Sequence, residues 1–321
     1  MPSYKIIKLR NLTPLHVGTG KENYDFSASE LQSDTLTAAL AAIRVQSGNA
    51  TDVSGFLNSF SLSSAFPFTG ERIFLPKMQG KIPMVEDKSE ARKRLKKVRY
   101  IEKEIWCEMI QGKVVKTTDE QFNGDYLTSS EKLKDFHVKS VHQRVFIPRE
   151  DNDKTEPFFF EWNFFHPDSG LFVIVDSDES LFVEIRNLFK ALGEIGLGTD
   201  KNIGGGKFDI EVDELHLPDV KDANHTMLLS LYIPTEDEFS KLNLPESKFN
   251  LSLRGGFMAG SSEEKLRHLR KKSIYMFGVG TLFPIIIPLH GKVVDLRPDW
   301  NDERMHSVYK SGKPFYLPVK L

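Results

Sequence analysis

Alternating charged and apolar positions at the start of the chain predict a β-strand over Tyr4–Arg10. Further along, apolar residues recur at helical spacing through an Ala-rich segment from Thr35 to about Gln46. We expect this segment to form a helix. Asp34 stands directly before it, and its side chain is expected to serve as the N-cap.

Two basic segments predict helices with a positive face. The longer runs from Ser89 to about Cys107, and the shorter from Ser262 to Lys272. The longer helix would line up Arg92, Lys96, Arg99 and Lys103 beside an apolar stripe. Two interpretations stay open for such a face. It binds RNA or an acidic partner, or it is simply a solvated surface.

Aromatic residues dominate Pro157–Phe165, which is followed by a turn at His166–Gly170 and the apolar run Leu171–Val175. This order predicts a β-hairpin. An amphipathic helix is expected next over Ser180–Leu192, with Gly193 at its C′ position.

A glycine-rich loop and a strand over Lys207–Val212 complete the N-terminal pattern. The order strand, helix, hairpin, helix, strand predicts a ferredoxin-like βαββαβ domain over residues 1–217. This domain would carry a large insertion at about 66–150. Residues 218–321 are rich in expected strands and predict a second, degenerate ferredoxin-like domain. The predicted fold class is therefore α+β, with two ferredoxin-like (RRM-like) domains.

The bulk composition fits two domains of ordinary size and excludes several classes of protein. The chain has 321 residues, a net charge of -2 and a single cysteine, Cys107. This charge argues against a uniformly basic surface but leaves room for a local basic groove. One cysteine excludes an internal disulfide framework. Because no apolar run reaches membrane-spanning length and no signal peptide is recognisable, we expect a cytoplasmic protein.

The most unusual segment is Gly196–Ile210, where five glycines fall within eleven residues. It does not match a Walker A loop, because Phe208 stands where that motif needs Ser or Thr. It does not match a dinucleotide fingerprint either, because Lys201 occupies the position of the last glycine. Both motifs also lead into a helix, whereas this loop leaves a helix and enters a strand.

The helix dipole therefore cannot be the anion-binding device of this loop. What remains is a flexible run of backbone N–H groups next to Lys201, Asn202 and Lys207. Such a run suits an extended anionic polymer better than a single caged phosphate. The alternative interpretation is an ordinary helix-to-strand connection with additional glycines.

The pattern G-x-G-x-D-K-N-x-G-x-G-x-F in this loop resembles the glycine-rich loop of the RAMP superfamily, the ferredoxin-like RNA-binding proteins of CRISPR systems. Other segments are similar to one family within it, the fourth subunit of the type III-A CRISPR Csm complex. These segments are Leu15–Gly20, Ser33–Leu40, Phe66–Phe68, Leu75–Lys77, Lys97–Tyr100, His142–Arg149, Phe159–Glu161, Arg270–Ser273, Gly278–Gly280, His290–Gly291 and His306–Tyr309. Together they extend over nearly the whole chain, although residues 111–139 match no part of the pattern.

This resemblance implies an RNA-binding subunit of an antiviral ribonucleoprotein, with no catalytic activity and no cofactor or metal of its own. The subunit would hold the 5′ tag of the crRNA. It would also contact the large polymerase-like Csm subunit and abut a Csm backbone RAMP subunit. Target sequence would be read by pairing between guide and target, as in other RNA-guided complexes.

The expected RNA contacts lie in the two glycine-bearing loops and at basic positions. They are His16, Gly18, Thr19, Gly20, Lys77, Arg144, Arg149, Lys201, Asn202, Gly204, Gly205, Gly206, Lys207, Arg254 and Lys272. Arginine is suited to this role because it binds phosphate in a bidentate manner and stacks on bases. Each position also has a plain alternative, namely a structural histidine, a simple turn or a surface salt bridge.

Two other functions stay open. The first is a RAMP endoribonuclease that processes precursor crRNA. Such enzymes typically carry a histidine near the first helix, yet Thr35–Gln46 has none, and no acid or second histidine stands near His16 to pair with it. No Cys/His set has metal-ligand spacing. The second alternative is a protein scaffold without RNA contact, which the basic clusters and the glycine loop disfavour.

Overall fold

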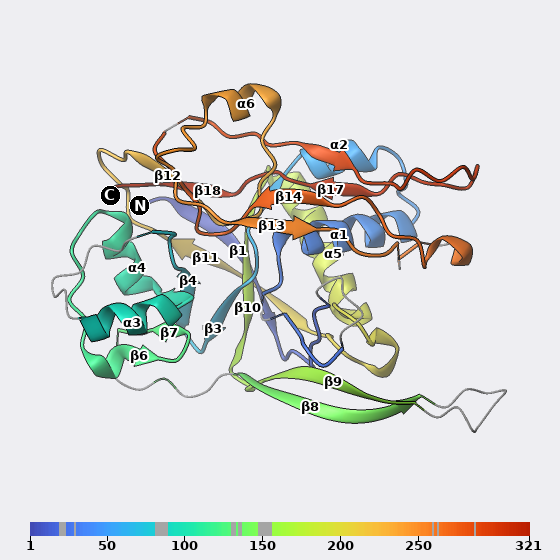
Figure 1. Ribbon diagram of the computed structural model, residues 1–321, viewed down its shortest axis with the longest axis horizontal. Coiled ribbons are helices and arrows are strands. Elements are labelled where there is room, and N and C mark those ends of the chain that lie inside the picture. The colour runs from blue at the N-terminus through green and yellow to red at the C-terminus, as the bar shows by residue number, and fades with distance from the viewer. Residues whose placement is uncertain are drawn as a thin grey trace.

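The computed structural model describes residues 1–18, 24–28, 30–80, 89–129, 133, 137–146, 156–258, 260–261, 263–285 and 287–321. A mixed α+β architecture is built around one large sheet (Figure 1). Its strand order is β11-β1-β10-β3-β4-β5-β7-β6, with β2 pairing to β10 off this path. The bounds are β1 Ser3–Arg10, β2 Ser61–Leu62, β3 Phe66–Thr69, β4 Arg72–Pro76, β5 Tyr100–Glu102, β6 Phe122–Asn123, β7 Tyr126–Leu127, β10 Ser169–Asp176 and β11 Asp209–His216.

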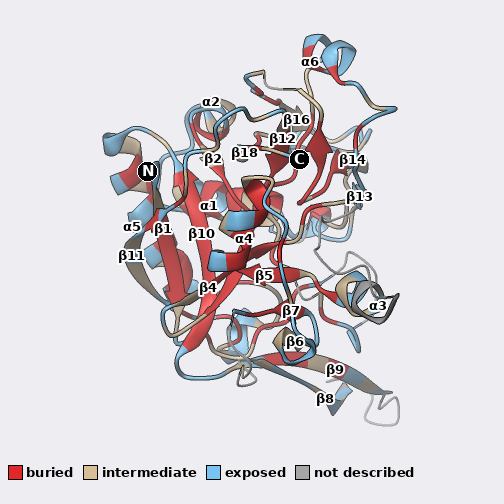
Figure 2. Cartoon of the chain, turned by 90° about the vertical axis from the view of Figure 1, so that its left-hand side faces the viewer, coloured by how far each residue is buried: buried red, intermediate tan, exposed pale blue. Residues whose placement is uncertain are grey.

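Both faces of the central strands are buried, because alternate residues of β1 enter different clusters. Ile7 packs with the helices α1 (Ser33–Gln46), α2 (Val53–Asn58) and α5 (Glu179–Ile195). Ile6 packs on the opposite face, among residues of the insertion and of the C-terminal strands. Figure 2 shows the result, with β4 and β10 coloured as buried along most of their length and β1 over its middle.

Smaller elements flank this sheet. The insertion contributes α3 (Ser89–Lys97), α4 (Lys103–Ile110) and the 3₁₀ turn η1 (Asp119–Gln121). The C-terminal residues form three small antiparallel sheets, β15-β12-β18, β13-β14 and β16-β17, together with α6 (Glu236–Lys241). Their strands are β12 His225–Leu228, β13 Leu251–Arg254, β14 Ile274–Phe277, β15 Leu282–Phe283, β16 Val293–Asp295, β17 Tyr309–Ser311 and β18 Tyr316–Val319.

A long two-stranded arm, β8 (His137–Phe146) paired with β9 (Glu156–Phe165), runs along the lower side of the molecule in Figure 1. The prediction of a hairpin between Pro157–Phe165 and Leu171–Val175 is therefore wrong. Seven of the eight residues of β10 are buried, which places that strand at the centre of the sheet between β1 and β3. The partner of β9 instead comes from the segment before it in sequence.

The strand over Tyr4–Arg10 and the helices expected over Thr35–Gln46 and Ser180–Leu192 are confirmed. Gly193, however, lies inside α5, which continues to Ile195. A side chain at Gly193 would meet the carbonyl of Phe208 at 2.2 Å, so the missing side chain lets helix and loop pack closely. The glycine with positive φ at the helix end is Gly196, with φ 96° and ψ 156°.

Neither predicted basic helix forms as one continuous helix. The Ser89–Cys107 segment is divided into α3 and α4 by β5, which pairs with β4. Buried packing of Val98, Tyr100 and Ile101 accounts for the break, because tertiary pairing overrides local helix propensity. Within the described part of Ser262–Lys272, the structure has a single 3₁₀ turn, η3 (Glu264–Leu266).

Along the chain, β1, α1, β2/β3, β10, α5 and β11 follow a βαββαβ order, but β3 takes the place that we predicted for Pro157–Phe165. Residues 66–69, which we placed in the insertion, belong to the central sheet as β3. The division of the chain at 217/218 and a second ferredoxin-like fold stay predictions. One hydrophobic cluster includes residues from both sides of that division, such as Ile6 and Met227.

Candidate nucleic-acid interface

The glycine loop folds back on the N-terminal loop and is anchored to it by backbone hydrogen bonds. The N–H of Leu197 donates to the carbonyl of Gly206 at 2.8 Å, which closes the loop at its base. The N–H of Gly206 donates to Pro14 at 2.9 Å, and that of Thr199 donates to His16 at 3.1 Å. Two of the segments that carry the family resemblance therefore form one unit.

Three glycines of this loop are needed for its own fold, because no side chain would fit at their positions. Gly196, Gly198 and Gly206 have positive φ, and a Cβ at each would stand 2.0–2.4 Å from a backbone oxygen. Gly205 is also enclosed, because a Cβ there would meet the indole of Trp162 at 2.8 Å. Gly204 differs. Its φ is 88°, and a Cβ built on it meets no atom of the described residues within 4 Å.

The open tip of the loop consists of the short 3₁₀ turn η2 (Lys201–Ile203) and Gly204. Lys201, Asn202 and Ile203 are exposed, with 67% of the surface of Ile203 accessible. Lys207 is exposed at the end of the loop. Among the described residues, no carboxylate lies within ion-pair distance of Lys201 or Lys207. Their charges are therefore available to an outside anion.

Arg144, on β8, connects the arm to the glycine loop. Its guanidinium forms an ion pair with Asp200, the residue before the tip. It also lies 4.4 Å from the ring centroid of Phe160 and 5.3 Å from that of Trp162. Both rings are buried. A planar guanidinium suits this combination of stacking and ion pairing.

His16 is buried, with 1% of its surface exposed. Its Nδ1 lies 2.8 Å from the carbonyl oxygen of Glu161, and its ring centroid lies 4.4 Å from that of Phe160. These contacts favour the structural alternative for His16, and an RNA contact there stays a prediction. Gly18 is exposed beside it. Thr19, Gly20 and Arg149 lie outside the described residues.

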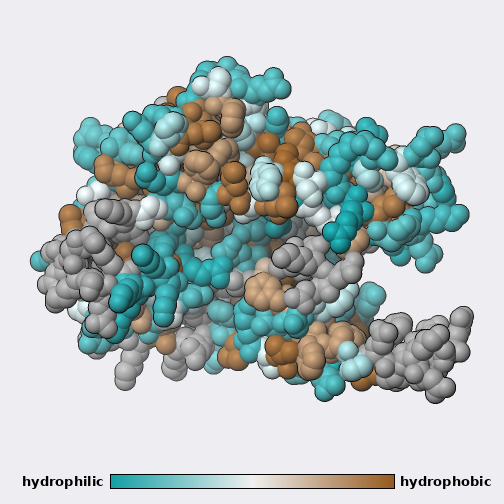
Figure 3. All heavy atoms as spheres, viewed as in Figure 1, coloured by the Kyte–Doolittle hydropathy of each residue, from teal (hydrophilic) through white to brown (hydrophobic). Residues whose placement is uncertain are grey.

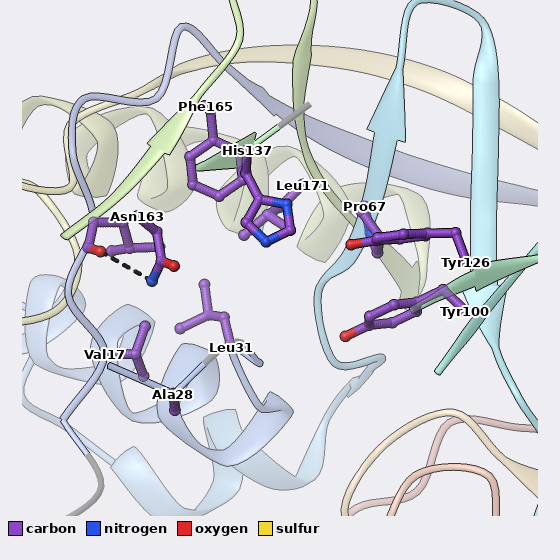
Figure 4. A pocket seen from close by; sticks show the side chains of 11 residues that line it. Val17, Ala28, Leu31, Pro67, Tyr100, Tyr126, His137, Asn163, Phe165 and Leu171 are labelled. Carbon is purple, nitrogen blue, oxygen red and sulfur yellow. Dashed lines mark hydrogen bonds between the residues drawn. The ribbon is translucent and has the colours of Figure 1, made fainter. Parts of the chain in front are cut away.

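Beside this loop unit, a small cavity lies between the arm and the insertion (Figure 4). Figure 4 shows His137 and Phe165 on one side and the stacked rings of Tyr100 and Tyr126 on the other. Asn163 donates to the carbonyl of Leu15, while its own buried Oδ1 has no partner among the described residues. The cavity volume of about 30 Å³ admits a water molecule rather than a nucleobase.

A buried ion network stands elsewhere, where α1 meets the C-terminal strands. The carboxylate of Asp34, with no exposed surface, accepts from Arg254 at 2.8 and 2.9 Å and from Lys310 at 2.7 Å. Our prediction that Asp34 caps the helix is wrong, because α1 begins at Ser33 and its N-terminus has no side-chain cap. The carboxylate binds two cations instead of the helix backbone.

The two partners decide the ionisation of Asp34. Burial alone would raise the pKa of this carboxyl, but the positive charges of Lys310 and Arg254 outweigh it and lower the pKa to about 2. Nearby, burial and the charge of Lys310 lower the pKa of Lys271 to about 8. Nothing in the sequence indicated this network, because its members lie far apart along the chain.

The remaining predicted contacts are not gathered at the glycine loop. Lys77 donates to the carbonyl of Leu95 at 2.8 Å, and Lys272 pairs with Asp299 at 2.6 Å on the surface. The structure thus brings Arg144, Lys201, Asn202, Gly204–Gly206 and Lys207 together with His16 and Gly18, and it places Lys77, Arg254 and Lys272 apart from them.

Apolar groups are exposed in two places on the face shown in Figure 3, over β13–β14 and along the arm. The first includes Leu251, Leu253 and Tyr275, and the second includes Val141 and Phe159. No group of three or more potential metal ligands occurs within the described residues. Across the same ranges, no helix combines the length and the apolar character needed to span a bilayer.

Comparison with known proteins shows which proteins this chain is similar to. Residues 221–319 match the family model of the CRISPR Csm4 C-terminal domain. The chain is 23% identical over 335 residues to the CRISPR system Cms protein Csm4 of Thermococcus onnurineus (strain NA1), covering 100% of this chain and 98% of the relative. The chain therefore resembles Csm4 proteins along its whole length. The Csm4 protein of Streptococcus thermophilus is likewise 23% identical, over 95% of this chain and 96% of its own.

Solved structures of complexes that contain Csm4 include chains with a similar fold. A chain in the crystal structure of the Csm3-Csm4 subcomplex of the type III-A CRISPR-Cas interference complex superposes with a TM-score of 0.66 at 17% identity, covering 99% of this chain and 100% of that one. A chain of the Csm1-Csm4 cassette in complex with cA4 gives 0.63 at 18% identity, covering 100% and 99%.

Proposed function

We propose that this chain is the Csm4 subunit of a type III CRISPR Csm complex and that it holds the 5′ tag of the crRNA. In this proposal it also links the large Csm subunit to a backbone RAMP subunit. The names of the similar structures, which pair Csm4 with Csm1 and with Csm3, support the two protein contacts. Two ferredoxin-like domains, a cytoplasmic location and the absence of catalytic activity belong to the same proposal.

One observation supports RNA binding most directly. The glycine loop presents Lys201 and Lys207 without carboxylate partners among the described residues, next to an open Gly204. The loop base is fixed by close backbone contacts, so the tip is presented in a defined geometry. A single-stranded RNA backbone could approach Gly204 closely and place its phosphates near both ammonium groups.

The endoribonuclease alternative finds less support. His16 is enclosed between Phe160 and the carbonyl of Glu161, so its ring cannot reach a scissile phosphate in this conformation. Asp200, the acid nearest the loop tip, is paired with Arg144.

Co-purification tests the proposal. The tagged chain, expressed with the other proteins of its complex, is expected to carry a large subunit, a backbone subunit and RNAs with one uniform 5′ sequence. Recovery of the proteins with RNAs of random 5′ sequence would contradict tag binding while leaving the subunit assignment intact. Recovery of the chain alone would contradict both.

A further inference from the structure

A second cavity, of about 260 Å³, lies between the N-terminal part of the chain and strand β13. Its volume approaches the roughly 300 Å³ at which small-ligand sites begin. One wall is formed by twelve residues of the N-terminal part, and the other by Asn250, Ser252 and Val279. The twelve are Glu30, Gln32, Ser64, Ala65, Phe66, Pro76, Lys77, Gln79, Lys96, Val98, Arg99 and Tyr100. None of the glycine-loop residues lines it, so it is a separate site.

Positive charge exceeds negative charge in this cavity. Lys77, Lys96 and Arg99 line it, against a single carboxylate, Glu30, which pairs with Arg99. Two lysines are left without a carboxylate among the described residues. The Lys77 ammonium donates to the carbonyl of Leu95 at 2.8 Å, and burial lowers its pKa. Such a partly desolvated ammonium gains from an anion brought close to it.

The opposite wall offers uncharged hydrogen-bonding groups. The side chains of Asn250 and Ser252 form no hydrogen bond to any other described residue, although both line the cavity. An amide supplies two donors and an acceptor, and a hydroxyl supplies one donor together with acceptor capacity. These groups can recognise a base edge or a ribose 2′-hydroxyl, which a bare phosphate site would not need.

We infer that this cavity binds one nucleotide of single-stranded RNA, with its phosphate at Lys77 and Lys96 and its base or ribose at Asn250 and Ser252. The inference rests on the proposed function, because the nucleotide belongs to the same crRNA tag. It adds a second contact site, built from both parts of the chain, at a distance from the glycine loop. Binding of the tag would then connect the N-terminal part to the C-terminal strands.

Lys96→Ala and Asn250→Ala test this site, with Lys97→Ala as the matched control on the same helix. Lys97 is exposed and does not line the cavity. Affinity of the full chain for a fluorescent single-stranded RNA carrying the tag is measured against salt. Lys96→Ala is expected to weaken binding about threefold to tenfold. It should also lower the salt slope by about 0.7, the value for one phosphate on a single strand.

Asn250→Ala should weaken binding without a change in salt slope, and Lys97→Ala should change neither quantity. A 4-thiouridine placed at successive tag positions is expected to crosslink to the Asn250–Ser252 peptide from one position. Wild-type affinity in both cavity variants, without that crosslink, would overturn the inference and leave the proposed function standing. A loss of large-subunit binding with unchanged RNA affinity would also overturn it. Failure of the wild-type chain to bind tag RNA would instead overturn the proposed function.

Discussion

The carboxylate of Asp34 and the guanidinium of Arg254 form two hydrogen bonds, of 2.8 and 2.9 Å, across 220 positions of sequence. This pair, completed by the buried Lys310, joins the start of α1 to β13. Arg254 was expected to contact RNA, and that role stays a prediction. Because Arg254 already binds Asp34, any RNA that contacts it would share the guanidinium with this carboxylate.

Asp34→Asn should destabilise the fold strongly, because it leaves the buried Lys310 and the partly buried Arg254 without a counter-charge. Breaking one side of such a network costs about 3–5 kcal/mol. The free energy of unfolding in urea measures this loss. Asp299→Asn, which removes the exposed partner of Lys272, is the control and should cost no more than about 1 kcal/mol. Equal costs for the two variants would contradict the importance of the buried network.

The same pair predicts a pH dependence. The pKa of Asp34 is depressed from 3.8 to about 2 in the folded protein, so its contribution is complete above 3.8 and is lost as pH falls through 2. This contribution is on the order of 2 kcal/mol. Stability measured from pH 5 down to pH 2 should therefore fall less steeply in Asp34→Asn than in the wild type. Identical slopes would show that folding does not lower the pKa of Asp34.

Gly204→Asn and Gly206→Asn form a matched pair of substitutions, since both glycines have positive φ. Asparagine is used because it tolerates positive φ better than other non-glycine residues. Gly206→Asn should lower the melting temperature, since its Cβ would stand 2.0 Å from the carbonyl of Leu197. Gly204→Asn has open space and should leave the melting temperature nearly unchanged while weakening tag binding. Normal binding by Gly204→Asn would remove the loop tip from the RNA-facing surface.

Arg144→Lys keeps the positive charge but loses the flat surface that packs near Phe160 and Trp162. We expect faster amide hydrogen exchange in β8 and β9, with Arg186→Lys on the exposed side of α5 as the control. A double-mutant cycle of Arg144→Gln with Asp200→Asn, which removes both charges, should give a coupling of about 0.5–1 kcal/mol. A coupling of zero would mean that the ion pair does not hold the arm to the loop.

Incubation of the chain with labelled precursor crRNA, with and without divalent metal, should give no specific cleavage. The reason is that His16 is enclosed and has a backbone carbonyl rather than an acid as its nearest partner. His16→Gln retains a hydrogen-bonding side chain and serves as the control. Specific cleavage that this substitution abolishes would establish the endoribonuclease alternative.

The elements that the sequence predicted correctly are those whose burial follows from local periodicity. In β1 the alternation reflects two buried faces, and in α1 and α5 the helical stripes face one hydrophobic cluster. The errors arise where pairing with a distant segment of the chain determines the secondary structure. The aromatic run of β9 pairs with β8 rather than with β10, and Tyr100 leaves its expected helix to join β4.

The candidate site shows the same division. The glycine loop was recognisable because glycines are rare in such numbers, yet most of them serve close contacts inside the protein. The sequence could not distinguish Gly204 from Gly206, since the difference lies in the carbonyl of Leu197 facing the latter. It also could not reveal that Asp34 faces Arg254 and Lys310, because nothing local distinguishes an N-cap carboxylate from a buried partner.

The salt dependence of tag binding by Lys201→Ala/Lys207→Ala tests the central claim most directly. If both lysines contact phosphates of a single strand, the slope of log K against log salt should fall by about 1.4, at about 0.7 per phosphate. Lys190→Ala/Lys221→Ala, which removes two exposed lysines outside the loop, should keep the wild-type slope. An unchanged slope in the loop variant, with its melting temperature intact, would contradict the claim that the glycine loop grips the crRNA.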